Sequence, residues 1–261
     1  MSLAQQLESL MREGGIPPER SMARSGLTLA RVTNVSDPEK FNRVKCLPIG
    51  VPGEEETDWC YFMAPMGGPG RGVYFPPQVD DLVVLAYLDD DPHRPVVLGS
   101  IWNTEAAPPF TIQDGKVEDY AVRTPRGIDW TLHDEDQKQS VTLTMPSGAV
   151  LRLDDGAKTA TLQDKDGGNA LELNWDSGEA KLCCAKKLTL SAGDTTVTLE
   201  SGGALTVKCS GKLSAQAGSA EVKATGQLAL QGSSTAVKGD STLELSSSGM
   251  ATLKGGMVKI N

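Results

Sequence analysis

The last third of the chain, residues 188–261, repeats one short unit and limits the fold more than any other part of the sequence. Most units place a polar residue between two apolar residues, and successive units start about eight residues apart. Alternation at period two is typical of a strand with one buried face, and a short fixed repeat indicates a solenoid or β-helix. The units occupy 188–190, 197–199, 205–207, 213–215, 222–224, 228–230, 243–245, 251–253 and 258–260.

These units are too small to enclose a core by themselves. Each offers two modest apolar side chains on one face, and no Phe, Tyr or Trp follows Trp175. A single-chain solenoid usually needs about 20 residues per turn. We therefore expect three chains to wind together into a triangular prism with the apolar side chains inside. The predicted trimer core comprises Leu188, Leu190, Val197, Leu199, Leu205, Val207, Leu228, Leu230, Leu243 and Leu245.

Composition divides the chain and narrows its class. All 15 prolines lie at or before Pro146, and their absence afterwards suits continuous sheet. The net charge of −9 argues against a general nucleic-acid binder. The five cysteines, which include the adjacent Cys183 and Cys184, lack metal-ligand spacing. With no secretory signal at the start, we expect a protein made in the cytoplasm with reduced thiols.

The first hundred residues predict a short helix followed by a small barrel. Leu3, Leu7, Leu10 and Met11 share one stripe of a helix, so residues 1–25 are expected to be a docking segment. Residues 26–104 contain short strands separated by Pro and Gly turns, which is typical of an OB-fold. The expected strands are 27–35, 43–48, 58–66, 72–75, 81–88 and 95–102.

Ordered motifs in this segment carry a resemblance to a known family. They are RVKCLP at 43–48, Trp59, APMGGPGRGVYFPPQVDDLVVLAY at 64–87 and DPHRPVVLGSIWN at 91–103. Together they resemble the OB domain of spike proteins from contractile injection machines, a family that includes phage baseplate assembly protein V and the VgrG proteins of type VI secretion. The resemblance implies an all-β chain: an OB barrel at 26–104, a linker or neck at 105–121 and an intertwined, homotrimeric, triple-stranded β-helix needle at 122–261.

The resemblance also implies a mechanical function. Such a chain is the central spike of a baseplate, connects the hub to the membrane-piercing tip, and punctures the target cell envelope when the sheath contracts. Only 25 residues precede the barrel, so we expect a separate hub protein that contacts Leu3, Leu7, Leu10 and Met11. A PAAR-type tip protein is expected on the last strand. Its predicted contact residues are Met257, Val258, Lys259, Ile260 and Asn261.

The sequence predicts no catalytic, cofactor-binding or metal-ligating residue, and hence no enzyme. The stretch 103–122 is too short for the lysozyme domain that some phage spikes carry. The two histidines, His93 and His133, lie on turn-like sequence without a Ser-His-Asp pattern. The alternative is a β-helical, polysaccharide-degrading tailspike enzyme, which would need clustered carboxylates or arginines on an aromatic-lined face. Whether the machine is a phage, a tailocin or an extracellular injection system stays open.

Overall fold

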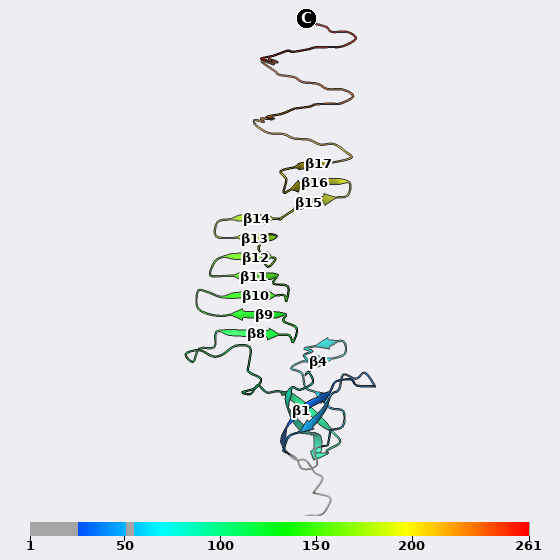
Figure 1. Ribbon diagram of the computed structural model, residues 1–261, viewed down its shortest axis with the longest axis vertical. Helices are drawn as coiled ribbons and strands as arrows, with labels where there is room; N and C mark the ends of the chain where they lie inside the picture. The colour runs from blue at the N-terminus through cyan, green and yellow to red at the C-terminus, as the bar shows by residue number, and fades with distance from the viewer. Residues whose placement is uncertain (1–25, 51–54, 261) are drawn as a thin grey trace, which may run out of the picture. The chain divides into compact units, whose positions relative to one another are not determined.

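The computed structural model describes residues 26–50 and 55–260, and these residues are almost entirely β-strands, turns and extended segments (Figure 1). The expected N-terminal helix, with Leu3, Leu7, Leu10 and Met11, lies outside the described residues, as does Asn261. The chain divides into two units, Met1–Ala185 and Lys186–Asn261. No helix in the described part is long and apolar enough to cross a membrane.

Five strands of the first unit form the expected OB-like barrel. Their order is β2-β1-β6-β7-β3, with β3 parallel to β7 and the other neighbours antiparallel. Val44 and Cys60 exchange two backbone hydrogen bonds of 3.0 and 2.7 Å, which join the two edges of the curled sheet. The strands are β1 (Leu27–Asn34), β2 (Lys45–Pro48), β3 (Tyr61–Phe62), β6 (Leu82–Tyr87) and β7 (Pro95–Ser100). The predicted fold class, all-β with an OB barrel, is confirmed.

The barrel core follows from alternation along these strands. In β6, for example, Val83, Leu85 and Tyr87 are buried while the residues between them are only partly buried. Alternate residues of a strand point to opposite faces, so each strand contributes one row to the interior. The core comprises Ala30, Val32, Val44, Cys46, Cys60, Val83, Leu85, Tyr87 and Val97, with Phe62 packed against it.

The segment between β3 and β6 differs from the expected strands 58–66 and 72–75. A small hairpin of β4 (Gly67–Gly68) and β5 (Arg71–Gly72) stands there instead. Gly72 has a φ of +148°, and a Cβ at this position would lie 2.6 Å from the carbonyl oxygen of Met66. Only glycine lets the chain fold back so closely, and this is why the glycine run forms a hairpin.

The second half of the first unit is a seven-stranded antiparallel meander, in which each strand pairs with its neighbours in sequence (Figure 1). Each strand has five residues. Gly127 and Gly148, both with positive φ, lie in two of the turns that reverse the chain. The strands are β8 (Asp119–Arg123), β9 (Asp129–His133), β10 (Ser140–Thr144), β11 (Val150–Asp154), β12 (Thr159–Gln163), β13 (Ala170–Asn174) and β14 (Glu179–Cys183).

The second unit begins with strands and continues as extended segments. β15 (Lys187–Ala192), β16 (Thr195–Glu200) and β17 (Leu205–Lys208) form a three-stranded antiparallel sheet. Residues 209–260 contain no strand; extended stretches alternate with bends, and Figure 1 shows this part as a zigzag. The bends lie at 210–211, 218–219, 225–226, 233–234, 240–241, 248–249 and 256.

The strand pairing refines the expectation of an intertwined needle from residue 122 onward. The ladders of β8–β14 and of β15–β17 join strands of the same chain. Short turns bring consecutive strands together before another chain could intervene. By contrast, the described residues after Lys208 form no backbone–backbone hydrogen bond within the chain. The described residues 209–260 therefore leave their backbone groups without ladder partners in the chain, as strand pairing between chains would require.

Candidate assembly surfaces

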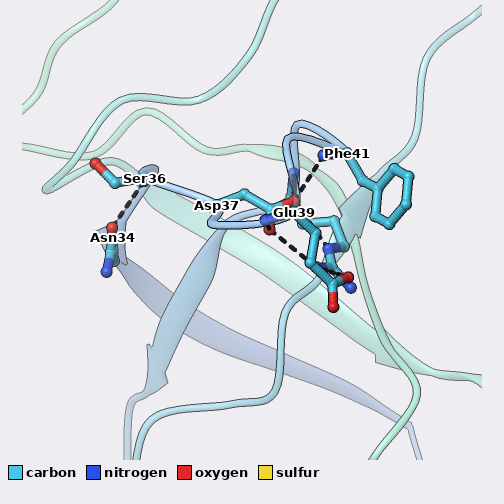
Figure 2. Close-up of polar contacts among 6 residues, drawn as sticks. Asn34, Ser36, Asp37, Glu39 and Phe41 are labelled. Carbon is cyan, nitrogen blue, oxygen red and sulfur yellow. Dashed lines mark hydrogen bonds and ion pairs between the residues drawn. The ribbon is translucent and has the colours of Figure 1, made fainter.

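The loop between β1 and β2 is built around the carboxylate of Asp37. Its oxygens accept hydrogen bonds from the backbone N–H groups of Glu39, Phe41 and Arg43 at 3.1, 3.0 and 3.3 Å. They also accept hydrogen bonds from Nε and Nη2 of Arg43, both at 2.9 Å. Figure 2 shows Phe41 and Glu39 arranged around Asp37. Just before them in the chain, the backbone N–H of Ser36 donates a hydrogen bond to Oδ1 of Asn34 at 2.7 Å. The loop is therefore held in one conformation.

The charge of Asp37 is well stabilised. The hydrogen bonds from the Arg43 guanidinium hold the pKa of the Asp37 carboxyl well below its ordinary value, with the backbone N–H groups adding to this effect and desolvation opposing it. In turn, Asp37 raises the pKa of Arg43 above its already high value. Nη2 of Arg43 also lies 2.8 Å from Oε2 of Glu39. Arg43 thus stays charged, paired and fixed.

Aromatic side chains surround this fixed guanidinium on the outside of the barrel. The Cζ atom of Arg43 lies 5.2 Å from the ring centre of Phe41 and 5.9 Å from those of Trp59 and Tyr61. Guanidinium groups at such distances attract ring faces. We call Phe41, Arg43, Trp59, Tyr61 and Met63 the aromatic face.

Two buried thiols lie behind this face. Cys46 and Cys60 are fully buried, and Thr57 Oγ1 lies between them: it accepts the Cys46 backbone N–H at 3.1 Å and lies 3.2 Å from Cys60 Sγ. Interaction with the Cys60 thiol, together with burial, raises the pKa of the Cys46 thiol. These contacts tie β2 to the segment that leads into β3.

The meander carries two unbroken apolar columns on one face. Cross-strand register places an apolar residue of every strand, from β8 to β14, in each column. The first column is Tyr120, Leu132, Val141, Leu153, Ala160, Leu173 and Ala180. The second column is Val122, Trp130, Leu143, Leu151, Leu162, Leu171 and Leu182. None of the predicted trimer-core residues lies in this part, although the sequence shows the same alternation at 141–143, 151–153 and 160–162.

These columns are left uncovered by their own chain. Their large exposed side chains retain between 37 % and 52 % of their accessible surface. Column residues line part of one open hollow of about 600 Å³, together with Trp175 and polar residues such as Asp155, and most of a second hollow of about 440 Å³, which Phe75 also lines. The middle residue of each strand from β9 to β14 points to the opposite face and is polar: Thr131, Thr142, Arg152, Thr161, Glu172 and Lys181. The sheet is thus strongly amphipathic.

The predicted trimer-core residues fall into two groups. Register in β15–β17 places Leu188, Leu199 and Leu205 opposite one another, with Leu190, Val197 and Val207 beside them, on one face. The structure therefore brings these six together within one chain. Leu228, Leu230, Leu243 and Leu245 lie on the extended segments and are exposed, as are Met257 and Ile260 of the predicted tip contact. A single chain does not bring these residues into one cluster.

His133 marks the polar edge of the meander. Its Nδ1 lies 2.8 Å from Oδ1 of Asp119 on the neighbouring strand, and its Nε2 lies 3.4 Å from Oε2 of Glu135. The bond to Asp119, together with Glu135, raises the pKa of His133, and burial opposes the shift. Within the described part of the chain, no group of three or more His, Cys, Asp or Glu side chains is placed to hold a metal ion.

Comparison with known families bears on the barrel. Residues 28–102 match the family model of the type VI secretion system/phage-baseplate injector OB domain. The chain carries a baseplate-injector OB domain. This match confirms the family resemblance read from the motifs, and a baseplate-injector OB domain implies association with other baseplate components. No curated protein matches the chain. The aromatic face lies on the injector OB domain itself.

Proposed function

We propose that this chain is the structural spike of a contractile injection machine and that three copies form it. The observation that carries the proposal is the pair of uncovered apolar columns on β8–β14, joined to an injector OB domain. A monomer would leave both columns in water, whereas soluble monomers rarely expose contiguous apolar patches beyond a few hundred Å². A second copy of such a flat, amphipathic sheet is the natural cover.

Three copies suit the geometry better than two. Three meanders can turn their apolar faces to one axis and their polar faces to solvent, as in a triangular prism. Fully burying one exposed Leu or Val side chain contributes about 1.5–3 kcal/mol. The column residues are already partly covered and two are alanines, yet fourteen positions per chain still add up to a substantial driving force. The face of β15–β17 with Leu188, Leu199 and Leu205 is apolar in the same way and would also need cover from other copies.

The extended segments after Lys208 support the same assembly by a second route. Their backbone N–H and C=O groups have no ladder partner in the chain, and an ordered extended backbone normally pairs. Two other copies of the same segment would supply these partners in an intertwined β-helix. The bends that recur every seven or eight residues would then form its corners.

The spike acts mechanically in this proposal. It is assembled in the baseplate, links a separate hub protein to a PAAR-type tip, and is driven through the target envelope on contraction. No catalysis is required of it. The hub contact at Leu3, Leu7, Leu10 and Met11 and the tip contact at 257–261 remain part of the proposal and rest on the family resemblance.

Complementation of particles that lack this chain tests the role. Wild-type protein should restore baseplates that contract and inject, and Leu162→Asp, which places a charge in a column, should not. Thr161→Asp changes the neighbouring residue on the polar face and should restore injection. Normal injection with Leu162→Asp would contradict the proposal. Release of sugar from envelope polysaccharide by the purified chain would instead support the enzyme alternative.

A further inference from the structure

The aromatic face of the barrel exposes a dense group of residues that typically dominate protein interfaces. Phe41, Tyr61 and Met63 retain 58 %, 56 % and 61 % of their surface in a chain whose barrel core is otherwise closed. Arg43 and Trp59 lie among them. Aromatic residues, Met and Arg are enriched at interfaces, and Trp, Tyr and Arg are enriched among the residues that carry most binding energy.

The side chains of this face are fixed before any partner arrives. The Asp37 side chain is 2 % exposed and that of Arg43 15 %, and the two share a bidentate ion pair. Because the loop backbone hydrogen-bonds the same carboxylate, Phe41 is anchored at its base (Figure 2). Binding therefore orders few additional groups, which lowers its entropic cost.

The charge around the aromatic face restricts what can bind it. The segments that form it, residues 37–45 and 55–63, hold five carboxylates (Asp37, Glu39, Glu55, Glu56, Asp58) against three cations (Lys40, Arg43, Lys45). Arg43 is already paired with Asp37 and Glu39, and Lys45 lies 3.5 Å from Glu56. Of these three cations only Lys40 has no ion pair with a described residue, which leaves too little positive charge to neutralise the phosphate groups on which nucleic-acid binding depends.

We infer that the aromatic face docks another baseplate protein, whose contacting surface is apolar at its centre and carries lysine or arginine at its edge. The apolar centre covers Phe41, Tyr61 and Met63. The basic edge faces Glu55, beside which lie Glu39 and Asp58, already paired with Arg43 and His93. Complementary charge of this kind fixes the register of two proteins and speeds their encounter. The inference rests on the proposed function in one respect: the partner is sought within the assembled machine.

Photo-cross-linking in purified particles tests the inference. A photoreactive phenylalanine analogue replaces Tyr61 in the full chain, and mass spectrometry identifies the adduct. The expected adduct is a different baseplate protein, linked through a segment with apolar residues flanked by Lys or Arg. The control places the same analogue at Leu27, which is 69 % exposed but outside the aromatic face, and should give no such adduct.

Binding measurements with that purified baseplate protein complete the test. Phe41→Ala and Tyr61→Ala should each weaken binding at least about tenfold, Glu55→Lys should slow association, and Leu27→Ala should change neither. An adduct to another copy of this chain, to nucleic acid or to nothing would overturn the inference, as would faster association with Glu55→Lys. If the chain forms trimers and enters particles but gives no adduct at position 61, only this inference fails. If the chain is a monomer and is absent from particles, the proposed function fails.

Discussion

Leu151 of β11 lies directly opposite Leu162 of β12, and both side chains are about half exposed in a sheet whose other face is polar. The same relationship recurs along the meander, from Leu143 opposite Leu151 to Leu171 opposite Leu182. A fold that aligns leucines so regularly, yet leaves them uncovered, is built for association. The first prediction follows from this pair.

Leu162→Asp should dissociate the assembly without unfolding the single-chain ladder. The substitution places a carboxylate at the centre of the proposed interface, and an uncompensated buried charge costs about 3–5 kcal/mol. Sedimentation over a dilution series should therefore show monomers at concentrations where wild type stays associated. Thr161→Asp, on the polar face, should sediment like wild type. Equal association of both variants would show that the columns are not the interface.

Backbone amides of residues 209–260 should be protected from hydrogen exchange only in the assembled protein. The chain itself offers these amides no ladder partner, so protection must come from other copies. Amides of β8–β14 should show partial protection even in the dissociated Leu162→Asp variant, because their ladders are internal. Slow exchange of the amides of residues 209–260 in a monomer would show that their protection does not come from other copies.

The stability that His133 contributes should fall as pH rises. Its pKa is raised above the ordinary value of about 6.5, because the hydrogen bond to Asp119 and the interaction with Glu135 favour the charged ring more than burial opposes it. The contribution is thus fully present below the ordinary pKa and is lost as pH rises through the raised one. The Tm difference between wild type and His133→Gln should be larger near pH 6 than near pH 9. A difference that grows with pH would contradict the assignment.

Leu85→Ala should destabilise the barrel by about 2–5 kcal/mol, since it empties a fully buried core position. Hydrogen exchange of β1 and β6 amides measures this locally, without assuming that both units unfold together. The exposed Leu27→Ala should change the same amides by less than about 0.5 kcal/mol. A Leu85→Ala effect no larger than that of Leu27→Ala would mean that the barrel core lies elsewhere.

The barrel could be predicted from sequence because alternation and motif order agree in it. The strand expected at 81–88 is β6 at Leu82–Tyr87, and the buried Val83 and Leu85 follow its period. The hairpin at Gly67–Gly72 was harder to foresee, because it depends on how closely Gly72 approaches Met66. Asp37 was missed for a similar reason: a lone aspartate in a loop becomes informative only once the chain returns Arg43 to it.

Strand pairing in the repeats could not be read from their pattern. The apolar–polar–apolar units before and after Lys208 alternate in the same way. Alternation therefore predicts strands in both regions but does not say which strands pair. The difference lies in the connections: β15, β16 and β17 are joined by turns short enough to pair them in sequence, whereas the later segments meet at bends and stay unpaired. The columns on β8–β14 show the same alternation as the predicted trimer core and could have been predicted with it.

The mass of the purified full-length chain in solution tests the central claim most directly. Light scattering during size-exclusion chromatography gives this mass independently of shape. The account predicts three times the 27.6 kDa of one chain, persisting on dilution through the micromolar range. A mass of one chain at those concentrations, with the columns of β8–β14 exposed to water, would contradict it.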